Sequence, residues 1–211
     1  MTPTPTGAPP SAEPLTSEAL AAGIAGHVED FLVALRAVAA ENDPGRSIPL
    51  LLLEISQMLF AGSRLGVERD FTPRSEYQPD VGPEPDLDDM RMQLAAILGD
   101  TDTYSFVFDP YDPEVVESQL SDDLTSIATD LDTGLRHFGA GNVEEALWWW
   151  QFSYVSSWGN LAGAALNALL SIVSHDRLDV EVVLDDDQVA AAEVMLESVD
   201  ETAAGSTPAS R

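Results

Sequence analysis

One long stretch of the sequence limits the possible folds more than any other. Residues 146–173 carry no formal charge and contain three consecutive tryptophans. A helix that is apolar on nearly all sides either spans a membrane or forms the centre of a soluble bundle. The stretch also contains polar residues, namely Gln151, Ser153, Ser156, Ser157, Asn160, Asn167 and Ser171. Because acids precede it and Arg177 follows it, no positive-inside asymmetry is present. We therefore expect a soluble, cytoplasmic protein with a central Trp-rich helix and no membrane partner.

The other core segments also have helical spacing. Their apolar side chains recur every three or four residues, and capping or stop residues such as Ser17 and Gly99 flank them. The predicted helices cover Ser17–Val38, Ser47–Gly66, a segment from Asp86 or Asp88 to Leu98, Asp112–Phe138 and the Trp-rich stretch after Asn142. Residues 104–111 have high strand propensity but no visible partner, so we expect an extended connection there. The sequence predicts an all-α bundle of five or six helices.

Both ends of the chain differ in composition from the core. Residues 1–16 are rich in proline and threonine and lack the basic and apolar segments of a signal peptide. Residues 176–211 contain ten acidic residues and two arginines, with room for a short helix near Gln188–Leu196. We expect residues 1–16 and 176–211 to be disordered tails around a single helical domain, residues 17–175.

The charge of the chain excludes several classes of function. Thirty-seven acidic residues face nine arginines and no lysine, which gives a net charge of −28. Nucleic-acid binding and polybasic membrane anchoring need clustered cations, so we expect no direct nucleic-acid binding. The absence of cysteine excludes a disulfide scaffold, a thiolate zinc site and a cysteine nucleophile. Common enzyme signatures are also missing. We assign no catalytic residue, metal site or cofactor, and we favour a protein that is not an enzyme.

Five polar residues are nevertheless candidates for chemistry. Asp123, Asp130 and His137 are spaced seven residues apart and share one helical strip. Carboxylates and imidazole can bind divalent cations, but ligands two turns apart lie about 10 Å from one another. His27 and Glu54 interrupt apolar helix faces and can form an acid–base pair with shifted pKa values. A structural role, with hydrogen bonds that fix the helices, is the simpler interpretation of both sets.

The aromatic residues of the Trp-rich helix point to a partner. Trp148, Trp149, Tyr154 and Trp158 cannot all face one core, because successive helical residues point 100° apart. Exposed indoles are favoured at interfaces. The leading hypothesis is a non-catalytic module that binds another protein. The alternatives are a metal-dependent or acid–base enzyme using the polar residues above, and an acidic mimic of nucleic acid that binds a basic partner.

Several local motifs also resemble a known family. They are Tyr104–Tyr111, Ser121–Leu124, Asp130–Leu131, Gly134–Leu135, Ala146–Phe152, Trp158–Gly159 and Ala165–Leu166. Together they resemble the bacterial family called domain of unknown function 5063, over about residues 20–173. The resemblance implies an all-helical domain without an assigned activity, common in actinobacteria and Bacteroidetes. Relatives often carry histidine near the Trp-Gly pair, where this chain has Ser157, Asn160 and Leu161. Because these three positions lack histidine, we expect no metal or acid–base role beside the Trp-Gly pair.

The composition of the tails leads to a first prediction. Deleting residues 1–16 and 180–211 should leave the melting temperature almost unchanged, since neither tail has enough apolar surface to offset an ordering entropy of about 1–2 kcal/mol per residue. Thermal denaturation of the truncated and full chains measures this. A drop of several degrees on removing residues 180–211 alone would show instead that the tail docks through Val189, Val194, Met195 and Leu196.

Overall fold

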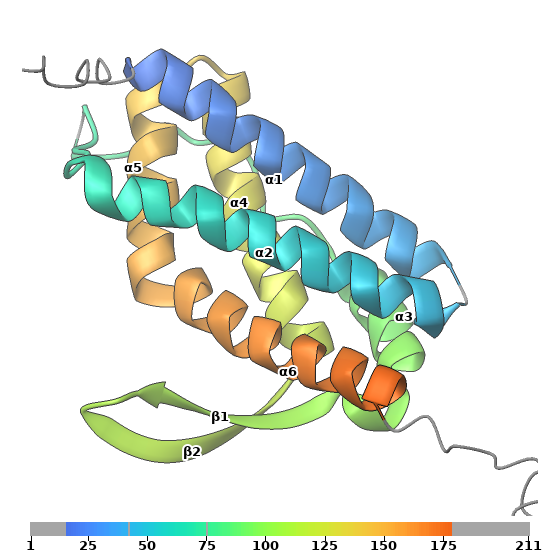
Figure 1. The fold of residues 1–211 in the computed structure, drawn as a ribbon. Coiled ribbons are helices and arrows are strands. Elements are labelled where there is room, and N and C mark those ends of the chain that lie inside the picture. Colours follow the sequence, from blue (N-terminus) through green and yellow to red (C-terminus); the bar gives the residue numbers. More distant parts are fainter. Residues whose placement is uncertain (1–15, 42, 75, 179–211) are drawn as a thin grey trace, which may run out of the picture. The chain divides into compact units, whose positions relative to one another are not determined.

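The structure is a computed structural model that describes residues 16–178, except residues 42 and 75 (Figure 1). These residues are mostly helical, as the apolar spacing predicts. The helices are α1 (Ser17–Ala40), α2 (Pro44–Glu68), α3 (Asp88–Leu98), α4 (Leu120–Gly139), α5 (Val143–Ser153) and α6 (Gly159–Leu178). Two strands, β1 (Thr103–Asp109) and β2 (Asp112–Gln119), precede α4. The chain divides into two units, Met1–Ser174 and His175–Arg211, and the fold described below is that of the first.

Helix boundaries follow capping chemistry, with two corrections to the sequence prediction. The hydroxyl of Thr16, not Ser17, caps α1 by accepting a hydrogen bond from the Ala19 N–H at 3.2 Å. Asp43 caps α2 and Pro44 occupies its first turn, so this helix begins before the predicted start at Ser47. Gly99 ends α3 with a φ of 55°, as predicted for a helix stop. The first error arises because the adjacent residues Thr16 and Ser17 both carry a capping hydroxyl group.

The core of the first unit lies among α1, α2, α4 and α5. α1 packs against α2 and also contacts α3, α4 and α5. The apolar stripe of α1 is buried, as the spacing predicts, with the exception of half-buried His27. The largest fully buried side chains include Phe31, Trp150 and Trp158.

A β-hairpin replaces part of the predicted fourth helix, so the fold is mostly helical but the purely all-α prediction is not confirmed. β1 and β2 pair antiparallel, with Phe106 opposite Val116 and Val107 opposite Val115. The expected N-cap at Asp112 is instead the first residue of β2, and α4 begins at Leu120. The side chain of Asp102 caps α4 in its place, accepting from the Ser121 N–H and hydroxyl, each at 2.8 Å. Pairing across a turn gives the strand-prone residues 104–107 the partner that the sequence prediction lacked.

The Trp-rich stretch is not one continuous helix. α5 ends at Ser153, a π-helical turn covers Tyr154–Trp158, and α6 then runs in a different direction (Figure 1). Phe152 and Val155 near this turn are 50% and 62% exposed, which contradicts an apolar helix buried on all sides. A central Trp-rich helix is therefore not confirmed. π-Helical turns of this kind redirect a helix and are frequent at functional sites.

Two neighbouring indoles of α5 bond to neighbouring carbonyls of α4. The Nε1–H of Trp149 donates to the Asp130 carbonyl at 2.8 Å, and the Nε1–H of Trp150 donates to the Leu131 carbonyl at 3.0 Å. The Trp150 ring lies directly over Gly134, where a Cβ atom would overlap the indole. Gly134 thus permits the close approach of α5 to α4.

The tail predictions fall mostly outside the described residues. The short helix expected near Gln188–Leu196 lies outside the described residues. At the start of the domain, Thr16 caps α1. At its end, α6 continues to Leu178, three residues past the predicted domain end. One described stretch, Pro44–Gly66 in α2, is long and apolar enough to cross a membrane by length and composition. Core helices of soluble proteins pass the same test, and this stretch is not the one singled out from sequence.

The Gly134–Trp150 contact leads to a second prediction. Gly134→Ala should lower the free energy of unfolding by about 1–3 kcal/mol, because the added methyl group overpacks the α4–α5 contact. Gly26→Ala is the matched control, since a Cβ atom there meets nothing within 4 Å and alanine is favoured in a helix by up to about 1 kcal/mol. Urea unfolding of both variants measures the difference. Equal effects of the two substitutions would contradict the role assigned to Gly134.

Candidate functional site

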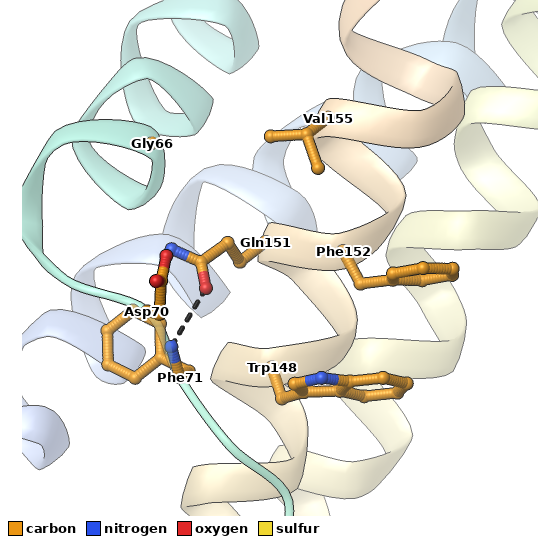
Figure 2. A pocket seen from close by; sticks show the side chains of 7 residues that line it. All are labelled: Gly66, Asp70, Phe71, Trp148, Gln151, Phe152 and Val155. Atoms are coloured by element: carbon orange, nitrogen blue, oxygen red, sulfur yellow. Dashed lines mark hydrogen bonds between the residues drawn. The ribbon is translucent and has the colours of Figure 1, made fainter.

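Gln151 on α5 connects the helix to the segment that follows α2. Its Nε2 donates to the carbonyls of Leu65 and Arg69, each at 2.7 Å. Its Oε1 accepts a hydrogen bond from the Phe71 N–H at 2.9 Å (Figure 2). All three bonds satisfy backbone groups at the end of a helix, where intrahelical partners run out. Gln151 therefore fixes the exit of the chain from α2 against α5.

A cavity of about 250 Å³ lies beside Gln151. Its lining residues are Gly66, Asp70, Phe71, Trp148, Gln151, Phe152 and Val155. Figure 2 shows Gln151 reaching toward Asp70 and Phe71, whereas Trp148 and Phe152 point to the other side of α5. The rings of Trp148 and Phe152 are stacked, with centroids 5.2 Å apart and planes 6° apart. The cavity thus has an aromatic and aliphatic wall with one carboxylate and one amide at its edge.

The four candidate partner-binding residues are not equally exposed. Trp148 is half-buried and reaches the cavity, while half-buried Trp149 is held by its bond to Asp130. Tyr154 is half-buried, and its ring contacts that of Trp158 at a centroid distance of 4.8 Å. Trp158 is fully buried, which is a correction: it offers no surface to a partner. Of the four, Trp148 is best placed for binding.

Asp123 anchors the hairpin. It is 6% exposed and accepts hydrogen bonds from the Tyr104 hydroxyl at 2.6 Å and the Ser118 hydroxyl at 3.0 Å. Burial raises the pKa of Asp123, and the two hydroxyl donors oppose that rise. Burial and the bond to Asp123 likewise raise the pKa of Tyr104. The carboxylate oxygens are engaged by β1 and β2, so this residue has the structural role.

Asp130 and His137 occupy separate surroundings along α4. Burial raises the pKa of Asp130, a hydrogen bond from Ser157 lowers it, and Glu84 raises it further. His137 is 2% exposed, and its Nδ1 has no hydrogen-bond partner among the described residues. Burial lowers the pKa of His137, the nearby Glu145 opposes this shift, and Arg136 adds to it. Over the described part of the chain, no group of three His, Asp or Glu residues is arranged to hold a metal ion.

His27 on α1 and Glu54 on α2 are near enough to interact electrostatically. Burial and the negative charge of Asp30 raise the pKa of Glu54, while His27 lowers it. Both side chains are half-buried. Among the described residues no hydrogen bond joins the two side chains, and the third charged group near them is Asp30.

Three further side chains, which the sequence does not predict to be functional, organise this region. From the sequence, Gln151 is only one of the polar residues within the Trp-rich stretch, although an amide within a run of aromatic residues indicates a buried polar contact. Glu145, 4% exposed, accepts from the Arg74 N–H at 3.2 Å. Arg136 pairs with Asp132 at 2.9 Å and donates to three successive carbonyls, those of Val81, Gly82 and Pro83. The segment between α2 and α3 is thus attached at three points, and the partners of each bond lie far apart in the sequence.

The fold and its site define a mostly helical domain with one β-hairpin and a Trp-rich α5. Residues 16–175 match the family described as Domain of unknown function (DUF5063), and the chain belongs to that family. The family resemblance drawn from sequence motifs is confirmed.

One solved structure extends the comparison. The crystal structure of protein BF1032 from Bacteroides fragilis has a TM-score of 0.57 and 16% sequence identity, and the match covers 71% of this chain and 89% of that chain. At this identity the likeness concerns the fold alone. No curated protein matches the chain.

The environment of His137 leads to a third prediction. Because burial lowers its pKa from 6.5, the unfolded chain takes up a proton before the folded chain as pH falls. This residue's contribution to stability is therefore present above about pH 6.5 and is lost as pH falls through its folded-state pKa. As pH falls from about 7.5 to about 5.5, the free energy of unfolding of His137→Gln should decrease by less than that of the wild type, which urea titrations measure. An equal loss of stability in His137→Gln and in the wild type over this pH range would contradict the assignment.

Proposed function

We propose that this domain is a non-catalytic protein-binding module of the bacterial cytoplasm. The observation that carries the proposal is the stacked Trp148–Phe152 pair at the edge of the cavity beside Gln151. Tryptophan contributes strongly to binding where its ring packs into a partner and water is excluded. The pair is presented on a helix whose neighbouring indoles are fixed to α4, so its position is set before binding.

The size and lining of the cavity favour a partner side chain as its occupant. A volume of about 250 Å³ is below the usual range of small-molecule and cofactor sites, about 300–1,000 Å³. Phe152 and Val155 extend the apolar surface beyond the cavity, being 50% and 62% exposed. An apolar anchor in the cavity, surrounded by contacts to these two residues, is the arrangement typical of a protein interface.

The polar candidates support the non-catalytic interpretation. Asp123 is engaged by two hydroxyl groups, and Asp130 and His137 lie in separate environments. A general base needs an accessible lone pair within reach of a substrate proton. The alternative is the pair of His27 on α1 and Glu54 on α2, in which burial raises the pKa of Glu54.

A fourth prediction tests the proposal. Phe152→Ala should remove a stoichiometric protein partner from native affinity purification of the full chain, because it deletes half of the stacked pair. Phe60→Ala is the matched control, since Phe60 is 64% exposed on α2 and lies outside the cavity. Mass spectrometry identifies a partner captured by the wild type and by Phe60→Ala. A partner set that both substitutions leave unchanged would refute this surface, and a partner lost only at high salt would favour the acidic mimic.

A further inference from the structure

The hairpin has one feature that the fold does not use: its outer edges. β1 and β2 form a two-stranded sheet, so each has an edge without a further strand among the described residues. Large apolar side chains of the hairpin and its turn are exposed, including Val107 at 44%, Val115 at 72% and Tyr111 at 96%. Two-stranded hairpins are marginally stable alone, and an unpaired edge is a template for another strand.

The hydrogen-bond pattern shows which backbone groups face outward. The Leu120 N–H donates to the Asp102 carbonyl at 2.8 Å, at the base of the ladder. In an antiparallel pair, hydrogen-bonded and non-hydrogen-bonded positions alternate. The opposed residues Val107 and Val115 are therefore a non-hydrogen-bonded pair. The backbone N–H and carbonyl of each point to the outer edge of its own strand.

A groove follows the outer edge of β1, where the hairpin lies next to α6 (Figure 1). It consists of two cavities of about 380 and 270 Å³ that share Asn167. Consecutive residues of β1 line both cavities, and none of β2 lines either, so the groove runs along the edge of the sheet. The α6 side presents small residues and the exposed amides of Asn160 and Asn167. We call this feature the hairpin groove.

No charged residue lines the hairpin groove, and the charged residues of the hairpin itself are all acidic. The hairpin carries the exposed acids Asp109, Asp112, Glu114 and Glu117 and no basic residue. The facing part of α6, residues 159–174, has no charged residue. Exposed acids on an edge strand oppose pairing with a second copy of the same acidic chain. They attract a strand of opposite charge.

We propose that an extended, basic segment of another protein binds in the hairpin groove by adding a strand to the outer edge of β1. The backbone of the added strand pairs with the outward groups of β1, and its side chains alternate between α6 and solvent. Basic side chains of the added strand are then attracted by Asp109 on β1 and, across the width of β1, by Asp112, Glu114 and Glu117 on β2. This inference rests on the proposed binding function: it adds the chemistry of a partner and a second contact surface.

The test uses the full chain and a phage-displayed library of random twelve-residue peptides as the probe. We expect the enriched peptides to be basic, with alternating β-branched or aromatic residues. Val107→Pro, which removes an outward N–H on the groove side, should weaken their binding at least tenfold. Val115→Pro is the matched control, because it makes the same change at the opposed residue on the far edge. Circular dichroism checks that both variants fold.

A second pair of variants tests the groove without altering the hairpin. Asn167 and Leu170 are both exposed on α6, but only Asn167 lines the hairpin groove. Asn167→Arg should abolish peptide binding by bulk and like charge, and Leu170→Arg should leave it unchanged. Neutralising Asp112, Glu114 and Glu117 together as Asn and Gln should weaken binding at least tenfold at low salt and flatten its salt dependence.

The outcomes separate this inference from the proposed function. Peptides that lose binding to Val107→Pro and Asn167→Arg but still bind Phe152→Ala support the groove. Peptides that depend on Phe152 and tolerate both groove variants overturn the groove and leave the Trp148–Phe152 surface standing. A library that enriches no basic peptide overturns the inference, whatever affinity purification shows for Phe152.

Discussion

The bonds from Trp149 and Trp150 to neighbouring carbonyls of α4 set the geometry on which the remaining features depend. A helical carbonyl already accepts one backbone hydrogen bond, and the indoles use its second lone pair. Two such bonds from adjacent residues fix both the height and the rotation of α5, because successive side chains point 100° apart. Once α5 is fixed, Trp148 and Phe152, four residues apart, must point the same way, while Gln151 faces the end of α2. The position of the Trp148–Phe152 pair is thus a consequence of how Trp149 and Trp150 are bonded to α4.

The sequence predicts helices well and the hairpin poorly, for physical reasons. A helix is specified by neighbours three and four residues apart, so the apolar stripe of α1 and the stop at Gly99 are visible locally. The hairpin depends on the pairing of residues 103–107 with 115–119 across an irregular turn. Asp112-Pro113-Glu114 is also a good helix start, and only the pairing of Val115 and Val116 with β1 decides between the two structures. The local sequence after Asp112 is compatible with both a helix and a strand, and pairing with β1 selects the strand.

The candidate site is partly predictable for the same reason. An excess of tryptophan indicates that some indole lies near a surface, and Trp148 reaches the cavity. Trp158, by contrast, lies in the π-helical turn Tyr154–Trp158 and is fully buried, and no sequence signal specified that turn. Gln151 acts on residues more than eighty positions away along the chain, so its role could not be derived from spacing.

The same dependence on distant contacts explains why a chain of net charge −28 buries further carboxylates. Asp102, Asp123 and Glu145 are 5%, 6% and 4% exposed, and each accepts hydrogen bonds from a backbone N–H or a hydroxyl group. A buried carboxylate is tolerated when such donors replace its lost hydration. Asp102 and Asp123 hold the base of the hairpin, and Glu145 holds the segment between α2 and α3. Each buried acid therefore attaches a non-helical segment to the bundle. Those two segments border the hairpin groove and the cavity beside Trp148, so the buried acids hold in place the two surfaces to which we assign binding.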